Sequence, residues 1–265
     1  MGEELKYIEI LAARSTLPDV LEAAQDGGAT TSILLAGIES GLIDTAIVMF
    51  RDDDWHSIPG IAKSKEELLK AAGSKYIYMS PVAKLREAVK DENVKGIGFT
   101  GTPCMIKAAG AIERAVKEAH EKIRLKICLF CTHSWDWKEM KAILDELGVD
   151  IKDVTKMDIK GKFLFHTKDG KVYEYPLDKA EERSRPGCKL CLDFYDPTAD
   201  LAIGAIGSPK EWNTIIILTE RGKEFVEKAK ELGYIETKPV TEKGINLIKR
   251  FVKMKKEEAE KHRKK

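Results

Sequence analysis

Five cysteines are the residues of this sequence best suited to redox or metal chemistry. Cys188 and Cys191 form a CxxC motif on a predicted turn, where two thiolates can bind one metal centre. Cys104 follows a predicted strand that a proline ends, and Cys131 ends another predicted strand. Because strand ends meet at one edge of an α/β sheet, we expect these four thiols to converge.

Four converging thiolates are the ligand set of an iron–sulfur cluster or of a structural zinc ion. Zinc sites usually combine two close pairs of ligands, whereas Cys104 and Cys131 are isolated in the sequence, so the spacing favours a cluster. Buried free thiols are the third interpretation. Cys128 lies three residues before Cys131 on the same predicted strand, so its side chain faces the other way and is expected in the core.

Three glycine-containing segments offer backbone amides and hydroxyls that suit a phosphate or a flat ring. Read alone, each is more often an ordinary turn, but beside four candidate cluster ligands they indicate a cofactor site. The segments are 26–32, 72–76 and 204–209. A literal GxGxxG at 96–101 is not counted among them, because its glycines lie within a predicted strand and a proline follows.

The composition limits the class of protein. The 265 residues carry 45 Lys+Arg and 44 Asp+Glu, which argues against a general nucleic-acid binder and a long disordered chain. No run of about 18 apolar residues predicts a membrane span, and the acidic start of the chain does not resemble a targeting segment. The odd number of cysteines favours reduced thiols and a cytoplasmic protein.

The charge is unevenly distributed along the chain. Residues 249–265 hold nine Lys/Arg and three Glu, and the remaining residues have a net charge of −5. A basic helical tail of this kind is usually solvated and frayed. The alternative function is docking to an acidic partner subunit.

Hydrophobic periodicity predicts an α/β to α+β fold with mixed sheets and flanking helices, in one compact subunit. Predicted helices cover 17–42 (interrupted at 25–28), 64–72, 81–90, 106–119, 223–232 and 243–261. Predicted strands cover 43–50, 96–100, 125–130, 157–166, 172–176, 201–206 and 214–218. We expect three parts: a flavin-binding α/β part over 1–148, a strand-rich part over 149–248 that completes the cofactor site, and the basic tail over 249–265.

Motifs along nearly the whole chain resemble the beta subunits of coenzyme F420-reducing hydrogenases and F420-dependent formate dehydrogenases. Only the basic tail falls outside the resemblance. The motifs are Ala13-Arg14-Ser15-Thr16, Gln25-Asp26-Gly27-Gly28, Gly73-Ser74-Lys75-Tyr76, Thr102-Pro103-Cys104, Cys131, residues 157–163 (MDIKGKF), Gly187-Cys188-Lys189-Leu190-Cys191, Gly204, Gly207-Ser208-Pro209 and Trp212.

The resemblance implies a flavoprotein with FAD, one 4Fe-4S cluster and a site for the deazaflavin coenzyme F420. It implies that the cluster ligands are Cys104, Cys131, Cys188 and Cys191. The residues expected around FAD and the deazaflavin are Ser15, Asp26, Gly27, Gly28, Thr30, Gly73, Ser74, Lys75, Tyr76, Thr102, Lys162, Gly204, Gly207 and Trp212. Lys75, Lys160 and Lys162 are candidate counter-charges for the phosphate and glutamates of F420, or else solvated surface lysines.

The resemblance therefore predicts an archaeal oxidoreductase subunit that transfers electrons between a 4Fe-4S cluster, FAD and F420. Its expected partners are hydrogenase or formate dehydrogenase subunits that carry further iron–sulfur clusters. Two alternatives stay open: a ferredoxin-dependent iron–sulfur flavoenzyme with a different substrate, and a zinc-stabilised adaptor without redox activity.

Overall fold

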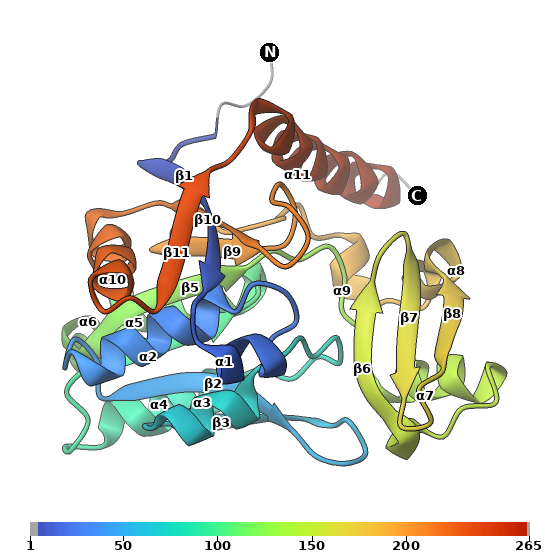
Figure 1. The fold of residues 1–265 in the computed structure, drawn as a ribbon, viewed down its shortest axis with the longest axis horizontal. Helices are drawn as coiled ribbons and strands as arrows, with labels where there is room; N and C mark the ends of the chain where they lie inside the picture. Colours follow the sequence, from blue (N-terminus) through green and yellow to red (C-terminus); the bar gives the residue numbers. More distant parts are fainter. Residues whose placement is uncertain (1–4, 264–265) are drawn as a thin grey trace.

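The computed structural model describes residues 5–263 and contains two separate β-sheets (Figure 1). The larger sheet mixes strands from both halves of the chain, so residues far apart in the sequence share one framework. Its eight strands lie in the order β11 (Ile235–Pro239), β1 (Glu9–Ser15), β10 (Asn213–Ile217), β9 (Leu201–Gly204), β5 (Ile123–Leu129), β4 (Ile97–Gly101), β2 (Thr45–Arg51) and β3 (Ser57–Ala62).

The four central strands β9, β5, β4 and β2 are parallel. Their carboxyl ends therefore lie at one edge of the sheet, which we call the carboxyl edge. The chain leaves this edge toward Cys104 after β4, toward Cys131 after β5, and toward Gly207 after β9. This is the edge at which α/β proteins commonly bind ligands.

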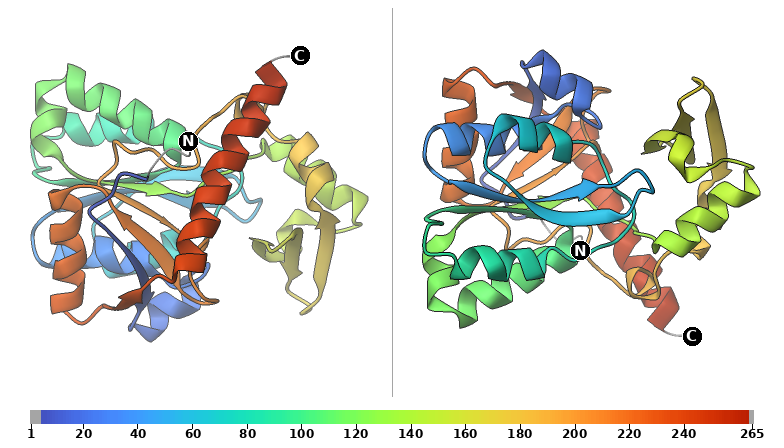
Figure 2. Two further views of the ribbon diagram at one scale, coloured as in Figure 1. Left: turned by 90° about the horizontal axis from the view of Figure 1, so that it is seen from above. Right: turned by 90° about the horizontal axis from the view of Figure 1, so that it is seen from below.

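Helices cover both faces of the larger sheet (Figure 2). One face packs against α2 (Ala29–Glu39), α3 (Lys65–Ala71) and α10 (Glu220–Glu231), and α1 (Pro18–Ala23) precedes α2. The other face packs against α4 (Val82–Lys90), α5 (Pro103–Ala115), α6 (Lys117–Lys122) and α11 (Glu242–Arg263).

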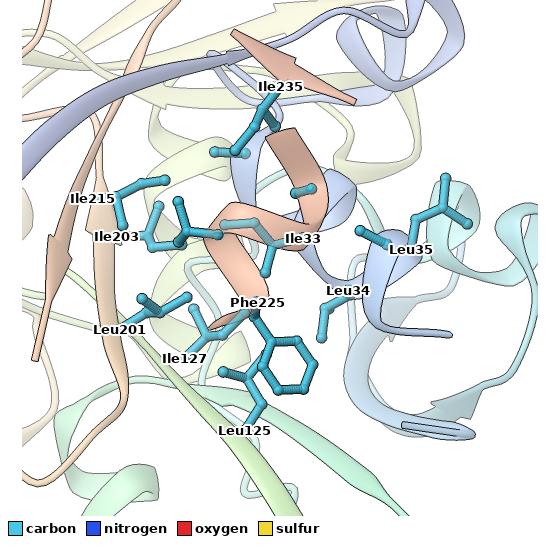
Figure 3. Packing of buried hydrophobic residues seen from close by; sticks show 14 of the residues in the cluster. Ile33, Leu34, Leu35, Leu125, Ile127, Leu201, Ile203, Ile215, Phe225 and Ile235 are labelled. Carbon is cyan, nitrogen blue, oxygen red and sulfur yellow. The ribbon is translucent and has the colours of Figure 1, made fainter. Parts of the chain in front are cut away.

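The core between α2, α10 and the sheet is aliphatic with one aromatic ring at its centre (Figure 3). Ile33 of α2 and Phe225 of α10 meet strand side chains such as Ile215. Ile216 points to the opposite core, because strand side chains alternate between the two faces. Both faces are buried, so the strands are continuous apolar runs in the sequence.

The smaller sheet forms a distinct unit beside the larger one (Figure 1). Its antiparallel strands are β6 (Val154–Ile159), β7 (Lys162–Thr167) and β8 (Val172–Pro176), and it carries α7 (Trp137–Glu146), a 3-10 helix (Ile151–Asp153) and α8 (Leu177–Glu182). Trp55 after β2 joins its apolar cluster and donates an indole hydrogen bond of 2.9 Å to the Val154 carbonyl. Through α9 (Pro186–Lys189) the chain returns to the larger sheet.

The predicted fold class is confirmed: a large mixed sheet with flanking helices. The start of α3 also forms as predicted, because the Ser64 hydroxyl accepts a hydrogen bond from the Glu67 amide. The Glu67 carboxylate accepts from the Lys63 amide at 2.6 Å, one residue earlier than in the usual capping box.

The single strand expected over 157–166 is wrong, because the chain turns at Lys160-Gly161 and forms the β6–β7 hairpin. Gly161 has a φ of 72°, which glycine adopts without a steric penalty. The helix expected over 106–119 is two helices, which meet at Val116 in an extended conformation. Strands β1, β3 and β11, helices α7, α8 and α9 and the 3-10 helix are not predicted, and Cys188 lies in α9 where a turn is expected.

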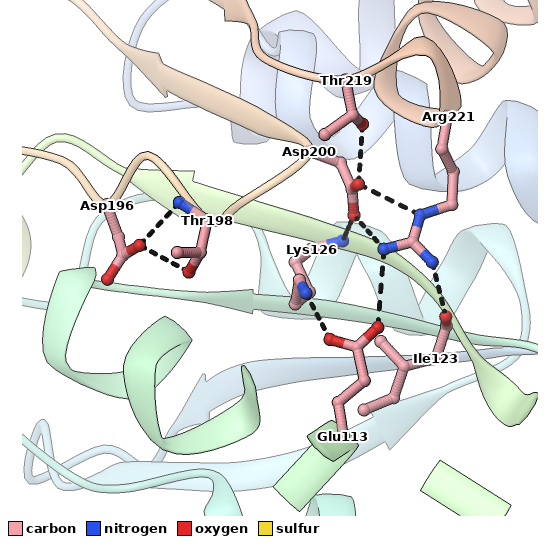
Figure 4. Close-up of polar contacts among 8 residues, drawn as sticks. All are labelled: Glu113, Ile123, Lys126, Asp196, Thr198, Asp200, Thr219 and Arg221. Atoms are coloured by element: carbon pink, nitrogen blue, oxygen red, sulfur yellow. Dashed lines mark hydrogen bonds and ion pairs between the residues drawn. The ribbon is translucent and has the colours of Figure 1, made fainter. Parts of the chain in front are cut away.

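A charged network lies opposite the carboxyl edge, where β9 begins (Figure 4). The Asp200 carboxylate accepts hydrogen bonds from both Nε and Nη2 of Arg221 at 3.0 Å, from the Thr219 hydroxyl and from the Lys126 amide. Glu113 pairs with the ammonium group of Lys126 and with Arg221. Every charge in this network thus has an opposite charge beside it.

The predicted basic tail belongs to α11, a continuous helix that begins before residue 249. It packs through Ile248 and Ala259, so the frayed, solvated tail is wrong for this helix. Residues 264–265 of the tail and residues 1–4 lie outside the described residues. Within residues 5–263, no helix is long and apolar enough to cross a membrane.

Candidate metal and cofactor site

Four of the cysteines come from three segments around the carboxyl edge. Cys104 is in the first turn of α5, with its sulfur 3.3 Å from the Thr102 hydroxyl. Cys131 follows β5, and its amide donates a 2.9 Å hydrogen bond to the Phe194 carbonyl. Cys188 lies in α9, and the amide of Cys191 donates back to its carbonyl. All five cysteines of the chain are free thiols.

These four thiols influence one another electrostatically. Burial raises the pKa of Cys131 to about 12, and the neighbouring Cys188, Cys104 and Cys191 thiols act in the same direction. Burial also raises the pKa of Cys191, with a contribution from Cys104. The hydrogen bond from Cys131 to Phe194, the 3.9 Å contact of the Cys188 sulfur with the Ser134 carbonyl and the ion pair between Lys107 of α5 and Asp193 link the segments that carry the four cysteines. Their role as one ligand set stays a prediction.

Cys128 is separate from this group. Its side chain is 0% exposed in the core under α5, and its sulfur accepts a hydrogen bond from the Asp196 amide at 3.3 Å. Burial raises its pKa well above the usual value, so it is held as a neutral thiol. The structure confirms the predicted core position of Cys128.

Helix α11 contacts the segment that carries Cys188. The Lys255 ammonium group, buried with 1% of the side chain exposed, donates a 2.7 Å hydrogen bond to the Cys188 carbonyl. Arg263 donates to the Leu190 carbonyl at 3.1 Å. The positive charge of Lys255 lowers the pKa of both Cys131 and Cys191, against the effect of burial.

His133 joins the same helix to the loop after Cys131. Its Nε2 lies 3.1 Å from a carboxylate oxygen of Glu258, and its Nδ1 lies 3.7 Å from Glu181. Burial and the charge of Lys255 lower the pKa of His133 to about 4, so the imidazole is neutral near pH 7. The contacts of His133 are thus those of a buried hydrogen-bonding residue.

The donor set suits an iron–sulfur cluster, because its members are all thiols and iron–sulfur clusters are held by four cysteine thiolates. Within residues 5–263, no three His, Cys, Asp or Glu side chains are close enough to hold a single metal ion. The cysteines of a 4Fe-4S cluster bind different irons, so they need not meet at one point as zinc ligands do.

The loop 25–28 is the centre of the predicted cofactor residues. The Gln25 side chain donates to the Met157 carbonyl at 3.2 Å and accepts from the Ser74 amide at 3.4 Å. Lys156 donates to the Gln25 carbonyl at 3.1 Å. These contacts bring the loop 73–76 and strand β6 of the smaller sheet to one place.

Gly27 packs directly against the segment that follows the 204–209 loop. A Cβ atom on Gly27 would lie 2.8 Å from the Asn213 amide nitrogen and 2.9 Å from the Trp212 Cα. The Asn213 side chain accepts from the Ala29 amide, at the start of α2. A glycine is required at Gly27 because three backbone segments meet there.

The Phe130 ring links the segment that carries Cys131 to the predicted cofactor loop 204–209. Phe130 precedes Cys131, and a Cβ atom on Gly204 would lie 2.4 Å from the Phe130 ring. Glycine at 204 therefore lets the strand end lie flat against this ring. Trp212, in the segment that follows the 204–209 loop, lies under the Lys238 ammonium group, which is 3.6 Å from the ring centroid.

The carboxylates of Asp26 and Asp158 interact electrostatically at the 25–28 loop. Burial, and then the charge of Asp158, raise the pKa of Asp26. Lys160 forms an ion pair with Asp158, which raises the pKa of Lys160. Burial and Asp158 also raise the pKa of Tyr76, whose ring makes edge contacts with Phe163. This phenol is therefore a proton-bearing group at neutral pH.

The predicted counter-charges are already engaged within the chain. The Lys75 ammonium group donates to the carbonyls of Ala71, Ala72 and Gly73 at the end of α3, and burial lowers its pKa to about 7. Lys162 forms an ion pair with Glu174 of β8. Neither lysine faces the site as an isolated cation.

The remaining predicted residues have structural contacts of their own. The Ser15 hydroxyl accepts from the Leu17 amide and from the Ser32 hydroxyl. Gly28, Gly73 and Gly207 have positive φ angles, and Thr30 lies in the first turn of α2.

Two features of the site are not predicted from the sequence. Residues of α11 contact the segment that carries Cys188, and the Gln25 side chain links the loop 73–76 to strand β6. One pattern was available for α11: Ile248, Lys255 and Ala259 recur at helical spacing, which predicts a buried face. The lysine within that face is the feature that marks it as unusual.

Comparison with known proteins agrees along nearly the whole chain. Residues 10–87 and 94–243 match the N-terminal and C-terminal family models of "Coenzyme F420 hydrogenase/dehydrogenase, beta subunit". The chain is 34% identical over 264 residues to the coenzyme F420 hydrogenase subunit beta of Methanosarcina barkeri, covering 97% of this chain and 91% of that protein. It is 35% identical over 264 residues to the subunit of that name from Methanothermobacter thermautotrophicus, covering 97% and 94%.

A solved structure is similar throughout the fold. A chain of the xenon-derivatised F420-reducing NiFe hydrogenase complex from Methanosarcina barkeri matches with a TM-score of 0.93 and 33% identity. The match covers 99% of this chain and 94% of that one.

Proposed function

Because the chain belongs to the family of coenzyme F420 hydrogenase and dehydrogenase beta subunits, we propose that it transfers electrons between a 4Fe-4S cluster, FAD and coenzyme F420. The family was predicted from the sequence motifs. The chain is an oxidoreductase subunit of this type. The proposal is supported by the position of Cys104, Cys131, Cys188 and Cys191 on linked segments around the carboxyl edge, with Cys128 buried in the core.

The four thiols would hold the cluster at the carboxyl edge. A bound cluster supplies single electrons, and a bound flavin converts between single electrons and the hydride that a deazaflavin carries. Cys104 is the exposed member of the set, so electrons from a hydrogenase or formate dehydrogenase partner would enter near α5.

The loop 25–28 and its neighbours would hold the flavin. The start of α2 has no acidic residue in its first turn, which suits a phosphate of FAD beside Gly28 and Thr30. Gly27 and Gly204 let the backbone approach a flat ring. Phe130, between Gly204 and Cys131, would separate the flavin from the cluster.

The binding of F420 would exploit the rim of the same site. Lys160 is half exposed beside Asp26, and Lys238 lies over Trp212. These cations suit the phosphate and glutamates of F420 better than Lys75, whose ammonium group donates to three carbonyls.

The test begins with the purified, anaerobic chain. We expect iron and acid-labile sulfide in equal amounts, a flavin spectrum, and bleaching of the flavin when reduced F420 is added. Flavin and iron without bleaching would favour the ferredoxin-dependent alternative. A colourless protein that contains zinc would contradict the proposal and favour the adaptor.

A further inference from the structure

Lys255 is a buried cation without a close carboxylate partner. Its side chain is 1% exposed, and the oxygen of Glu258 lies 3.9 Å away, at the limit of an ion pair. The other buried lysine of the described core, Lys126, is paired closely with Glu113. A buried charge is costly unless something compensates it, so Lys255 needs another source of negative charge.

The groups that face Lys255 are those of the cysteine site. Its ammonium group donates to the Cys188 carbonyl at 2.7 Å, and its charge acts on the thiols of Cys131 and Cys191. From the other elements, Glu181 of α8 and His133 also experience its charge. Two carboxylates, Glu258 and Glu181, and two thiols, Cys131 and Cys191, thus interact with Lys255. The thiols become negative when they bind metal.

Helix α11 holds this cation in place by contacts at both ends of the site. Arg263 donates to the Leu190 carbonyl, and Glu258 contacts His133 beyond Cys131. Ala259 packs in the core one turn after Lys255, which fixes the face that the helix presents. The lysine thus cannot move to solvent without displacing the helix.

We propose that Lys255 is a positioning residue that compensates the negative charge of a cluster held by the four cysteines, and so raises its reduction potential. The inference rests on the proposed function. One-electron reduction of such a cluster, by dithionite or by the proposed hydrogenase or formate dehydrogenase partner, would add one negative charge to the site without forming or breaking a bond. A fixed positive charge nearby stabilises that reduced form.

The experiment compares variants of the full chain by redox titration with dithionite, followed by the electron paramagnetic resonance signal of the reduced cluster. Lys255→Met should lower the equilibrium constant for one-electron reduction at least tenfold, which equals a shift of about 59 mV to more negative potential. Lys255→Arg should keep the wild-type potential. The control is Lys253→Met, which removes an exposed lysine of the same helix, and it should leave the potential unchanged.

Each outcome is decisive. An unchanged potential in Lys255→Met with full iron content would overturn the inference and leave the proposed function intact. Wild-type protein that binds no iron would overturn both. If Lys255→Met loses its iron while Lys255→Arg keeps it, the need for charge is supported. If both lose iron, Lys255 acts through packing and the charge argument fails.

Discussion

The two edges of the larger sheet carry buried polar groups of opposite kinds. At one edge, Asp200, Glu113, Lys126 and Arg221 neutralise one another through direct ion pairs (Figure 4). At the carboxyl edge, Lys255 donates to the Cys188 carbonyl, and burial raises the pKa of the Cys131 and Cys191 thiols. The first set is complete within the chain, whereas the second is balanced only when the thiols are ionised.

The comparison separates groups that stabilise the fold from groups that await a ligand. A complete network satisfies its hydrogen bonds and needs no further atom. Burial raises the pKa of Cys131 and Cys191, and cysteine thiols lose their protons when they bind a metal. The predictions below test this distinction.

The largest expected effect is on iron binding. Cys188→Ala removes one ligand at the carboxyl edge, and we expect loss of the bound iron and sulfide measured per chain. Cys128→Ala is the matched control, since its sulfur lies in the core. It should keep its iron and lose about 1 to 2 kcal/mol of stability through the small cavity. Loss of iron in Cys128→Ala and not in Cys188→Ala would refute the ligand assignment.

A substitution at the opposite edge should lower the free energy of unfolding without changing the cofactor content. Asp200→Ala leaves Arg221 and the Lys126 amide without their acceptor, and we expect a loss of about 3 to 5 kcal/mol in urea unfolding. The iron content of the folded fraction should not change. Asp145→Ala, which removes an exposed pair with Lys141, should cost less than about 0.5 kcal/mol. An equal loss of unfolding free energy in the two variants would show that the buried network contributes no more to stability than an exposed ion pair.

A smaller effect is expected where backbone segments meet beside the flavin loops. Gly27→Ala places a methyl group 2.8 Å from the Asn213 nitrogen, so the loop must shift and flavin binding should weaken. Gly110→Ala in α5 is the control, since its methyl group would meet only the flexible end of Arg114 at 3.4 Å. The control should retain flavin and gain about 0.5 to 1 kcal/mol from helix propensity. Flavin fluorescence titrations would measure the flavin affinity of both variants. Equal affinities would contradict the assignment of Gly27 to the flavin site.

The last effect is a dependence of stability on pH at Lys75, a residue outside both charged edges. Burial lowers its folded pKa to about 7, below the usual value of 10.5, so the unfolded chain binds the extra proton between these values. The contribution of Lys75 to stability therefore rises with pH from about 7 to about 10.5. The wild type and Lys75→Met, compared by urea unfolding across this window, should show a difference that grows with pH. Lys70→Met in the same helix should give a constant difference, and a flat profile for Lys75→Met would contradict the assigned pKa.

Local patterns predicted those parts of the fold that depend on local interactions. The start of α3 was found from Ser64 and Glu67, because a cap is made by residues three apart. The hairpin of β6 and β7 was missed because one turn glycine within a run of strand-forming residues does not interrupt the apolar pattern enough. Strands β1 and β11 were missed because they pair with each other over more than 200 residues of sequence.

The sequence by itself determined the family, the four candidate ligands and the core role of Cys128. These depend on residue type, motif order and strand alternation, which do not require knowledge of tertiary contacts. Only the tertiary structure placed Lys255 against Cys188 and made Gln25 the meeting point of three segments. A helical pattern specifies which face of α11 is buried, but the sheet order decides what that face covers. For this reason a tail that looked like solvated surface became part of the cysteine site.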